Sequence, residues 1–191
     1  MLDKLLAANF KLSSVLVWIG GAALIGAALM VTVDVILRDL FLVTLGGADE
    51  MSGYVFAIST AFAFPYAVLH RANVRIDALY IPLPAGIRSI LDIVALLGMA
   101  VFFFPLTWRV WLMLQESYKF WTKSITPLQT PLAIPQTLWF AGMLIFCATL
   151  LLVFVIAVVR LIRGDITGVH DIAGVPTLDE EMQSGDGGHA G

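Results

Sequence analysis

Apolar and polar residues follow one another in long blocks along the chain. Residues 12–33 contain no charged side chain over 22 positions, and three further apolar blocks follow. A transmembrane helix needs about 20 apolar residues, because an α-helix rises about 1.5 Å per residue. The pattern therefore predicts an all-α integral membrane protein with four transmembrane helices. We place the spans at about 13–35, 50–69, 89–108 and 137–160.

The two ends of the chain differ from this membrane domain, which we place at residues 13–163. Residues 1–12 mix Lys4 and Lys11 with apolar side chains, which is typical of a short interfacial helix. Residues 164–191 are rich in glycine and acids, so we expect a disordered tail. The first apolar block exceeds the about 7–15 residues of a signal-peptide core, and no Ala-x-Ala site follows it, so we interpret it as a retained helix.

The segments between the spans carry the turn and loop residues. A Gly-Gly pair at 46–47 predicts the first turn, and residues 70–88 form a polar connector that contains two prolines. The helical pattern of the third span continues to Trp121, which predicts one long helix that projects from the bilayer. Three prolines within 124–136 predict an irregular loop before the fourth span.

Charged residues are scarce and unevenly distributed. The chain is 60% hydrophobic and 13% charged, whereas soluble domains carry about 25% charged residues. This deficit excludes a soluble globular domain and a disordered chain, and the balance is not basic enough for a nucleic-acid binder. Six acids and no Lys or Arg occur from Asp165 onward, so the net charge of −3 belongs to the tail and the body is basic.

The distribution of Lys and Arg predicts the orientation, because cytoplasmic loops of membrane proteins are enriched in these residues. With the N-terminus inside, seven of these side chains lie on the cytoplasmic side and four on the other side. The cytoplasmic set is Lys4, Lys11, Arg71, Arg75, Arg88, Arg160 and Arg163, and the opposite set is Arg38, Arg109, Lys119 and Lys123. We therefore expect an N-in, C-in topology.

Side chains for several kinds of membrane chemistry are missing from the spans. The histidines, at 70, 170 and 189, all lie outside the centres of the spans, which argues against bis-His haem. Cys147 is the one cysteine, so the chain forms no internal disulfide, and no metal-ligand cluster or phosphate loop is evident. No ionisable residue stands at the centre of a span, as a proton pump or self-contained carrier usually requires. We expect no enzyme activity, cofactor or metal site.

The charges at the ends of the spans have two interpretations. They anchor the helices at the membrane interface, or they contact a partner membrane subunit. Glu50 also suits the first turn of a helix, where an acid complements the helix dipole, and Arg88 stands four residues before Asp92, which favours an ion pair. The candidate partner contacts are Arg38, Glu50, Arg71, Arg75, Asp77, Arg88 and Asp92.

The connector carries an ordered set of motifs. It reads Asn73-Val74-Arg75-Ile76-Asp77, then Leu83-Pro84, then Arg88 with Leu91-Asp92. This series resembles the small membrane subunit of tripartite ATP-independent periplasmic (TRAP) transporters, the DctQ-like family. Ala133-Ile134-Pro135-Gln136 is similar to the Ile-Pro-Gln segment before the family's fourth helix. The resemblance covers about residues 15–163; Asp39, which stands where the family often has an aromatic residue, and the acidic tail depart from it.

The resemblance implies a role in transport across the bacterial inner membrane. TRAP systems import organic acids with a sodium gradient, and a periplasmic binding protein captures the substrate. A large elevator-type subunit holds the substrate and sodium sites, and the small subunit is a scaffold beside it. On this view Arg75, Asp77, Arg88 and Asp92 order the connector or pair with the large subunit. Asp49, Lys119 and Lys123 become candidates for docking the binding protein, and no substrate site is expected here.

Two other functions remain open on sequence grounds. One is a membrane anchor subunit of a respiratory redox complex, which a haem absorption band or a bound quinone would indicate. The other is a free-standing membrane adaptor, which the absence of a neighbouring permease gene and binding-protein gene would favour.

Overall fold

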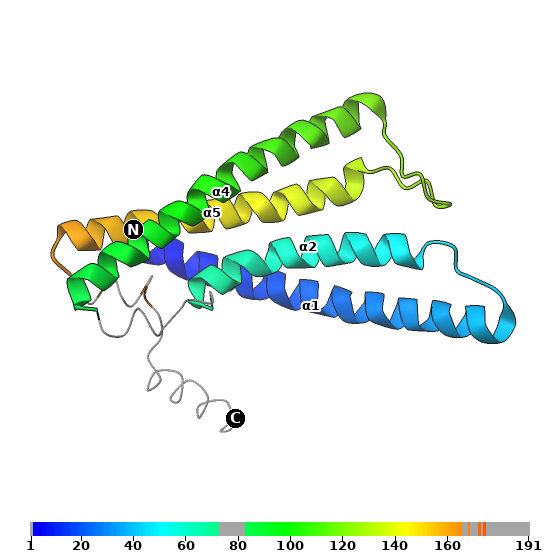
Figure 1. Ribbon diagram of the computed structural model, residues 1–191, viewed down its shortest axis with the longest axis horizontal. Helices are drawn as coiled ribbons and strands as arrows, with labels where there is room; N and C mark the ends of the chain where they lie inside the picture. Colours follow the sequence, from blue (N-terminus) through cyan, green and yellow to red (C-terminus); the bar gives the residue numbers. More distant parts are fainter. Residues whose placement is uncertain (1, 73–82, 166–167, 169–171, 173, 175–191) are drawn as a thin grey trace, which may run out of the picture.

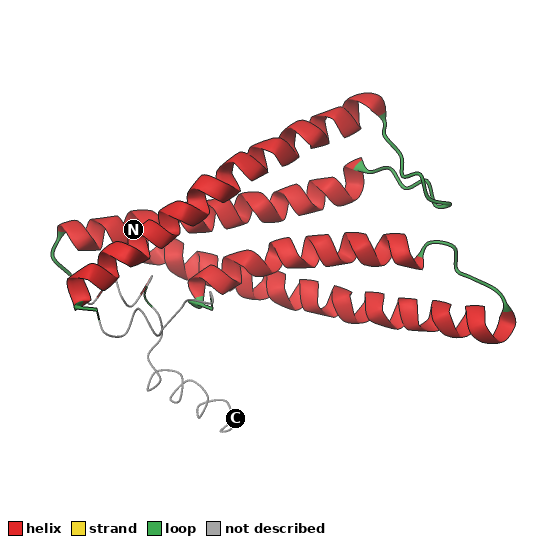
Figure 2. Ribbon diagram, viewed as in Figure 1, coloured by secondary structure: helices red, strands yellow, loops and turns green. Residues whose placement is uncertain are grey.

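Four long helices make up the described part of the protein. The computed structural model describes residues 2–72 and 83–165, together with residues 168, 172 and 174. Within these ranges the chain consists of helices and loops, with one isolated bridge between Lys123 and Pro131 in place of any strand (Figure 2). The expected all-α membrane fold is confirmed, because each of the four helices is long and apolar enough to cross a bilayer.

The first hairpin pairs α1 (Leu2–Phe41) with α2 (Ala48–Leu69). Their backbones approach closely where Gly20 faces Ser59, since a Cβ on Gly20 would lie 3.2 Å from the Cα of Ser59. The Ser59 hydroxyl donates a 3.0 Å hydrogen bond to the carbonyl oxygen of Gly20. The small Gly20 on one helix therefore lets the Ser59 hydroxyl of the other helix make a hydrogen bond inside the apolar region.

The second hairpin pairs α4 (Ala85–Phe120) with α5 (Ala133–Ile162). Pro84 precedes α4 in an extended conformation, where its fixed φ and missing N–H do no harm. The two helices meet through Thr107 and Cys147, whose side-chain Oγ1 and Sγ atoms are 3.2 Å apart. The single cysteine thus packs as a small core residue against α4, hydrogen-bonded to a threonine.

Helices α2 and α5 join the two hairpins, with α1 and α4 on the outside (Figure 1). A Cβ on Gly142 of α5 would lie 2.8 Å from the Cβ of Ala61, so this contact requires glycine. The rings of Phe64, Phe103 and Phe146 pack together from three helices, with centroids 4.6 to 5.6 Å apart. The buried core that surrounds them comprises Val68, Leu69, Leu96, Phe146, Leu150, Val153 and Ala157.

The helices are longer than the predicted spans, and this changes the picture at the N-terminus. Residues 1–12 were expected to form a separate interfacial helix, but α1 runs without a break from Leu2. The sequence there contains no proline or glycine to end a helix, and Lys4 and Lys11 are both exposed. The predicted continuation of the third span is confirmed, since α4 reaches Phe120. The loop predicted at 124–136 is shorter, because Pro135 lies in the first turn of α5, where proline is tolerated.

The two ends of the bundle hold different parts of the chain (Figure 1). The start of α1, the end of α2, the start of α4 and the end of α5 lie at one end, which we call the terminal end. The α1–α2 connection at 42–47 and the α4–α5 connection at 121–132, which we call the 121–132 loop, lie at the other, the loop end. Between them the outer faces are apolar and exposed, for example at Trp18, Ile25 and Val101, as expected where lipid replaces water.

Candidate functional site

Asp34 organises the α1–α2 connection at the loop end. Its side chain is buried, and Oδ1 accepts a 2.6 Å bond from the Leu45 N–H and a 2.9 Å bond from the Thr44 hydroxyl. The Thr44 oxygen in turn accepts a bond from the Gly46 N–H, and Gly46 adopts a φ of 72°, which favours glycine. Asp34 was not among the predicted site residues. An acid inside the apolar part of the helix, ten residues before a Thr-Leu-Gly-Gly turn, is the sequence signal that could have indicated it.

Glu50 in the first turn of α2 makes a contact that crosses between the hairpins at this end. The Tyr54 hydroxyl donates a 2.7 Å bond to its Oε1, and the Thr126 hydroxyl of the 121–132 loop donates to its Oε2. Both carboxylate oxygens of Glu50 therefore accept a hydrogen bond. Glu50 stands in the first turn of α2, as one of its two interpretations expects, and it also bonds to the loop of the other hairpin. Its contact with a partner subunit stays a prediction.

The 121–132 loop has its own backbone order. The Ser124 N–H donates to the Thr130 carbonyl, and the Leu132 N–H donates to the Thr122 carbonyl. Each of the two hydrogen bonds is 3.0 Å long. Trp121 ends α4 in the left-handed conformation, with φ 48°. These cross-loop bonds hold the two arms of the loop together, and Ile125 between them is fully exposed.

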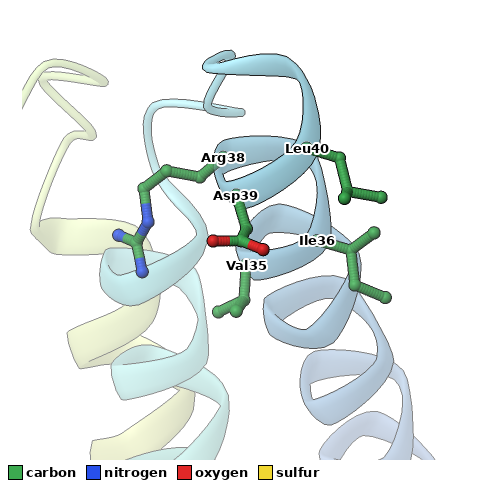
Figure 3. Close-up of a pocket in the computed structure, with 5 residues that line it drawn as sticks. All are labelled: Val35, Ile36, Arg38, Asp39 and Leu40. Atoms are coloured by element: carbon green, nitrogen blue, oxygen red, sulfur yellow. The ribbon is translucent and has the colours of Figure 1, made fainter.

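The end of α1 bears an open hollow of about 400 Å³, lined by Val35, Ile36, Arg38, Asp39 and Leu40 (Figure 3). Arg38 extends to one side of the helix end, whereas Ile36 and Leu40 point to the other side (Figure 3). All five lining residues come from one helix, and both charged side chains are exposed. The hollow therefore has no opposing wall that would enclose a small ligand.

The three predicted docking residues all lie at the loop end and are exposed. Asp49 neighbours Glu50 in the first turn of α2, and Lys119 and Lys123 flank the end of α4. The ammonium nitrogen of Lys119 lies 5.4 Å from the centroid of the Phe120 ring, within range of a cation–π interaction. The loop end thus presents both signs of charge beside exposed apolar side chains.

At the terminal end, the structure describes three of the five predicted charged residues. The Nε of Arg88 donates a 2.7 Å hydrogen bond to the Leu83 carbonyl, which ties the start of α4 to the residue before Pro84. Asp92 is fully buried. Arg71 follows α2 in the left-handed conformation, with φ 54°. Both roles expected of Asp92, ordering the connector and pairing with the large subunit, stay predictions. Arg75 and Asp77 lie outside the described residues, and the predicted Arg88–Asp92 ion pair stays a prediction.

His70 belongs to an aromatic group that sequence reasoning did not single out. Its ring stacks on Tyr66 with centroids 3.9 Å apart and meets the edge of Phe10 at 5.4 Å. Desolvation by these neighbours lowers the pKa of His70 below its ordinary value of 6.5. The group joins the start of α1 to the end of α2, so it closes the first hairpin at the terminal end. Helical spacing could have paired Tyr66 with His70, four residues later, but not Phe10 with His70, because residues 10 and 70 are far apart in sequence.

Within the described ranges, no three His, Cys, Asp or Glu side chains gather in a way that could hold a metal ion. The middle stretches of the four helices hold apolar and small polar side chains, and the charged side chains are at or near the two ends. The charged side chains of the described helices therefore gather toward the two ends of an apolar bundle.

Comparison with known proteins gives one match. The family model of the DctQ component of tripartite ATP-independent periplasmic transporters matches residues 27–164. No curated protein matches the chain, and no solved structure does. The matched region contains the last part of α1, from residue 27, and all of α2, α4 and α5, which is well over half of the 191 residues. The chain therefore belongs to the DctQ family of TRAP transporter components.

Proposed function

We propose that this small permease subunit is a scaffold for the large, elevator-type subunit in sodium-coupled uptake of organic acids. Family membership supports the setting, and one observation carries the scaffold role. The central stretches of all four helices lack Asp, Glu, Lys, Arg and His, so the chain offers no charged group at mid-membrane for an ion or a carboxylate substrate. Substrate and sodium therefore bind on another subunit.

The orientation and partners belong to the same proposal. The subunit lies in the bacterial inner membrane with both termini in the cytoplasm. The terminal end is then on the cytoplasmic side of the membrane, beside the cytoplasmic part of the large subunit. The loop end then faces the periplasm and offers Asp49, Lys119 and Lys123 to the substrate-binding protein. The terminal-end charges, including Arg75 and Asp77, order the connector or pair with the large subunit.

Reconstitution tests the scaffold role. The large subunit and the binding protein are placed in liposomes with and without this chain, and uptake of labelled organic acid is measured under an inward sodium gradient. We expect uptake only with both membrane subunits. Uptake by this chain without the large subunit would contradict the proposal, and so would full uptake by the large subunit alone.

Co-purification tests the terminal-end contacts. The single substitutions Arg75→Ala and Asp77→Ala should lower the yield of the complex with the large subunit, whereas the exposed loop-end substitution Asp39→Ala should not. An unchanged yield and unchanged uptake in both terminal-end variants would refute this part of the proposal.

A further inference from the structure

The two hairpins meet at the loop end through polar and apolar contacts that come from opposite halves of the sequence. Glu50 and Thr126 are 76 positions apart, yet the Thr126 hydroxyl donates to the Glu50 carboxylate. The buried core lies farther toward the terminal end, and in Figure 1 the hairpins diverge toward the loop end. A contact between the connections of the two hairpins there restrains a region that the core does not reach.

The hydrogen bonds around Glu50 have a defined direction. Thr126 has a single hydroxyl proton, and it points to Oε2 of Glu50. The Ser124 hydroxyl lies 2.8 Å from the Thr126 hydroxyl, and the Tyr54 hydroxyl donates to Oε1. The result is a chain of bonds from the loop to the carboxylate, which accepts from both sides. Bonds to an ionised acceptor are the stronger kind, so the arrangement suits a carboxylate better than an amide.

An apolar contact accompanies the polar one. Leu128 of the same loop packs on Gly47, where an added Cβ would lie 2.1 Å from the leucine Cδ1. Gly47 has an extended φ of −173°, so glycine is required here for space and not for its backbone conformation. The 121–132 loop is thus seated on the α1–α2 connection at two neighbouring points, Gly47 and Glu50.

We propose that Glu50 is a positioning residue that latches the 121–132 loop onto the α1–α2 hairpin. The latch makes the loop end one preorganised surface, on which the exposed Lys123 and Ile125 are held in fixed positions. The consequence of the latch for docking rests on the proposed function, in which the substrate-binding protein docks on this surface. A preorganised surface loses less conformational freedom on binding, so the latch strengthens docking without contacting the partner.

A distance measurement on the full chain tests the latch directly. In a Cys147→Ala background, spin labels are attached through Val43→Cys on the α1–α2 connection and Lys123→Cys on the loop, both at exposed positions. Glu50→Ala and Thr126→Val each remove one partner of the bond and should both broaden the distance distribution. Thr126 lies outside the helices, so its variant remains informative if Glu50→Ala impairs folding. Asp49→Ala, an exposed acid in the same turn, is the matched control and should leave the distribution unchanged.

The outcomes separate the latch from docking. An unchanged distribution in the Thr126→Val variant overturns the latch. Affinity for the binding protein is measured with the unlabelled variants, and we expect Thr126→Val to weaken it about tenfold, as ordering one or two extra side chains would. A broadened distribution with unchanged affinity retains Glu50 as the positioning residue and refutes docking at the loop end.

Discussion

At the residue scale, a few small side chains decide how the helices of this protein meet. Gly142 and Gly98 are both helical glycines in apolar surroundings, but only Gly142 has neighbours where a Cβ would be placed. Gly98 has open space around it. Because composition and spacing look similar at the two sites, the difference arises from packing, and it makes the two glycines a matched pair.

Gly142→Ala should destabilise the contact between α2 and α5. The new methyl group would lie 2.8 Å from the Cβ of Ala61 and 2.9 Å from Cδ1 of Phe62, so the helices must shift. We expect a loss of about 1–3 kcal/mol in unfolding free energy, as for other overpacked cores. Unfolding in detergent measures it, and Gly98→Ala is the control that should not lose stability. Equal stability of both variants would contradict the assigned contact.

The aromatic group around His70 predicts a pH dependence. Because its pKa is lowered in the folded protein, the neutral imidazole is favoured there, and charging costs more than in the unfolded chain. Unfolding free energy should therefore decrease as pH falls below about 6.5, and it should be independent of this group at higher pH. His70→Gln should reduce the decrease, as followed by unfolding at several pH values. A protein that gains stability on acidification through this group would show that the shift has the opposite sign.

At the scale of elements, each of the two connections at the loop end is held by hydrogen bonds to an acid in a helix. The α1–α2 connection depends on Asp34, which belongs to the helix, and the 121–132 loop depends on Glu50, which belongs to the other hairpin. Helix α4 has 36 residues, about 54 Å of helix, whereas the hydrocarbon core is about 30 Å thick. Part of α4 therefore extends beyond the thickness of the hydrocarbon core, and the 121–132 loop returns from its end to the start of α2.

Asp34→Ala should loosen the α1–α2 connection. The Leu45 N–H and the Thr44 hydroxyl lose their shared acceptor, while α1 itself keeps its backbone bonds. Amide hydrogen exchange within 42–47 should accelerate, and exchange in the middle of α1 should not. Asp39→Ala, an exposed acid one turn later, is the control. Unaltered exchange of the Leu45 amide in the Asp34 variant would be evidence against this assignment.

At the scale of the whole molecule, the N-terminus and the end of α5 lie at the same end of the bundle (Figure 1). An even number of crossings requires this, and the excess of Lys and Arg at that end supports placing it in the cytoplasm. The charged residues of the helices lie toward these two ends, and the exposed side chains between them are mostly apolar.

Cysteine accessibility checks the proposed orientation. In the Cys147→Ala background, Lys123→Cys should react with a membrane-impermeant maleimide in intact spheroplasts. Arg163→Cys, exposed at the end of α5, should react only after the membrane is permeabilised. The reverse labelling pattern would invert the topology, and with it the assignment of the loop end to the periplasm.

The sequence by itself determined the four membrane helices, the charges at their ends and, through the 73–92 motifs, the family that the family model then confirmed. These features are local, since a run of about 20 apolar residues is a helix in lipid whatever surrounds it. The sequence placed Glu50 at a helix start but did not predict its contact with Thr126. It also did not indicate the roles of Asp34 and of the aromatic group around His70. Those depend on which helices pack together, and that is decided by a few close approaches such as Gly142 on Ala61. Hydrophobic periodicity does not encode such contacts, because lipid and protein interiors are equally apolar.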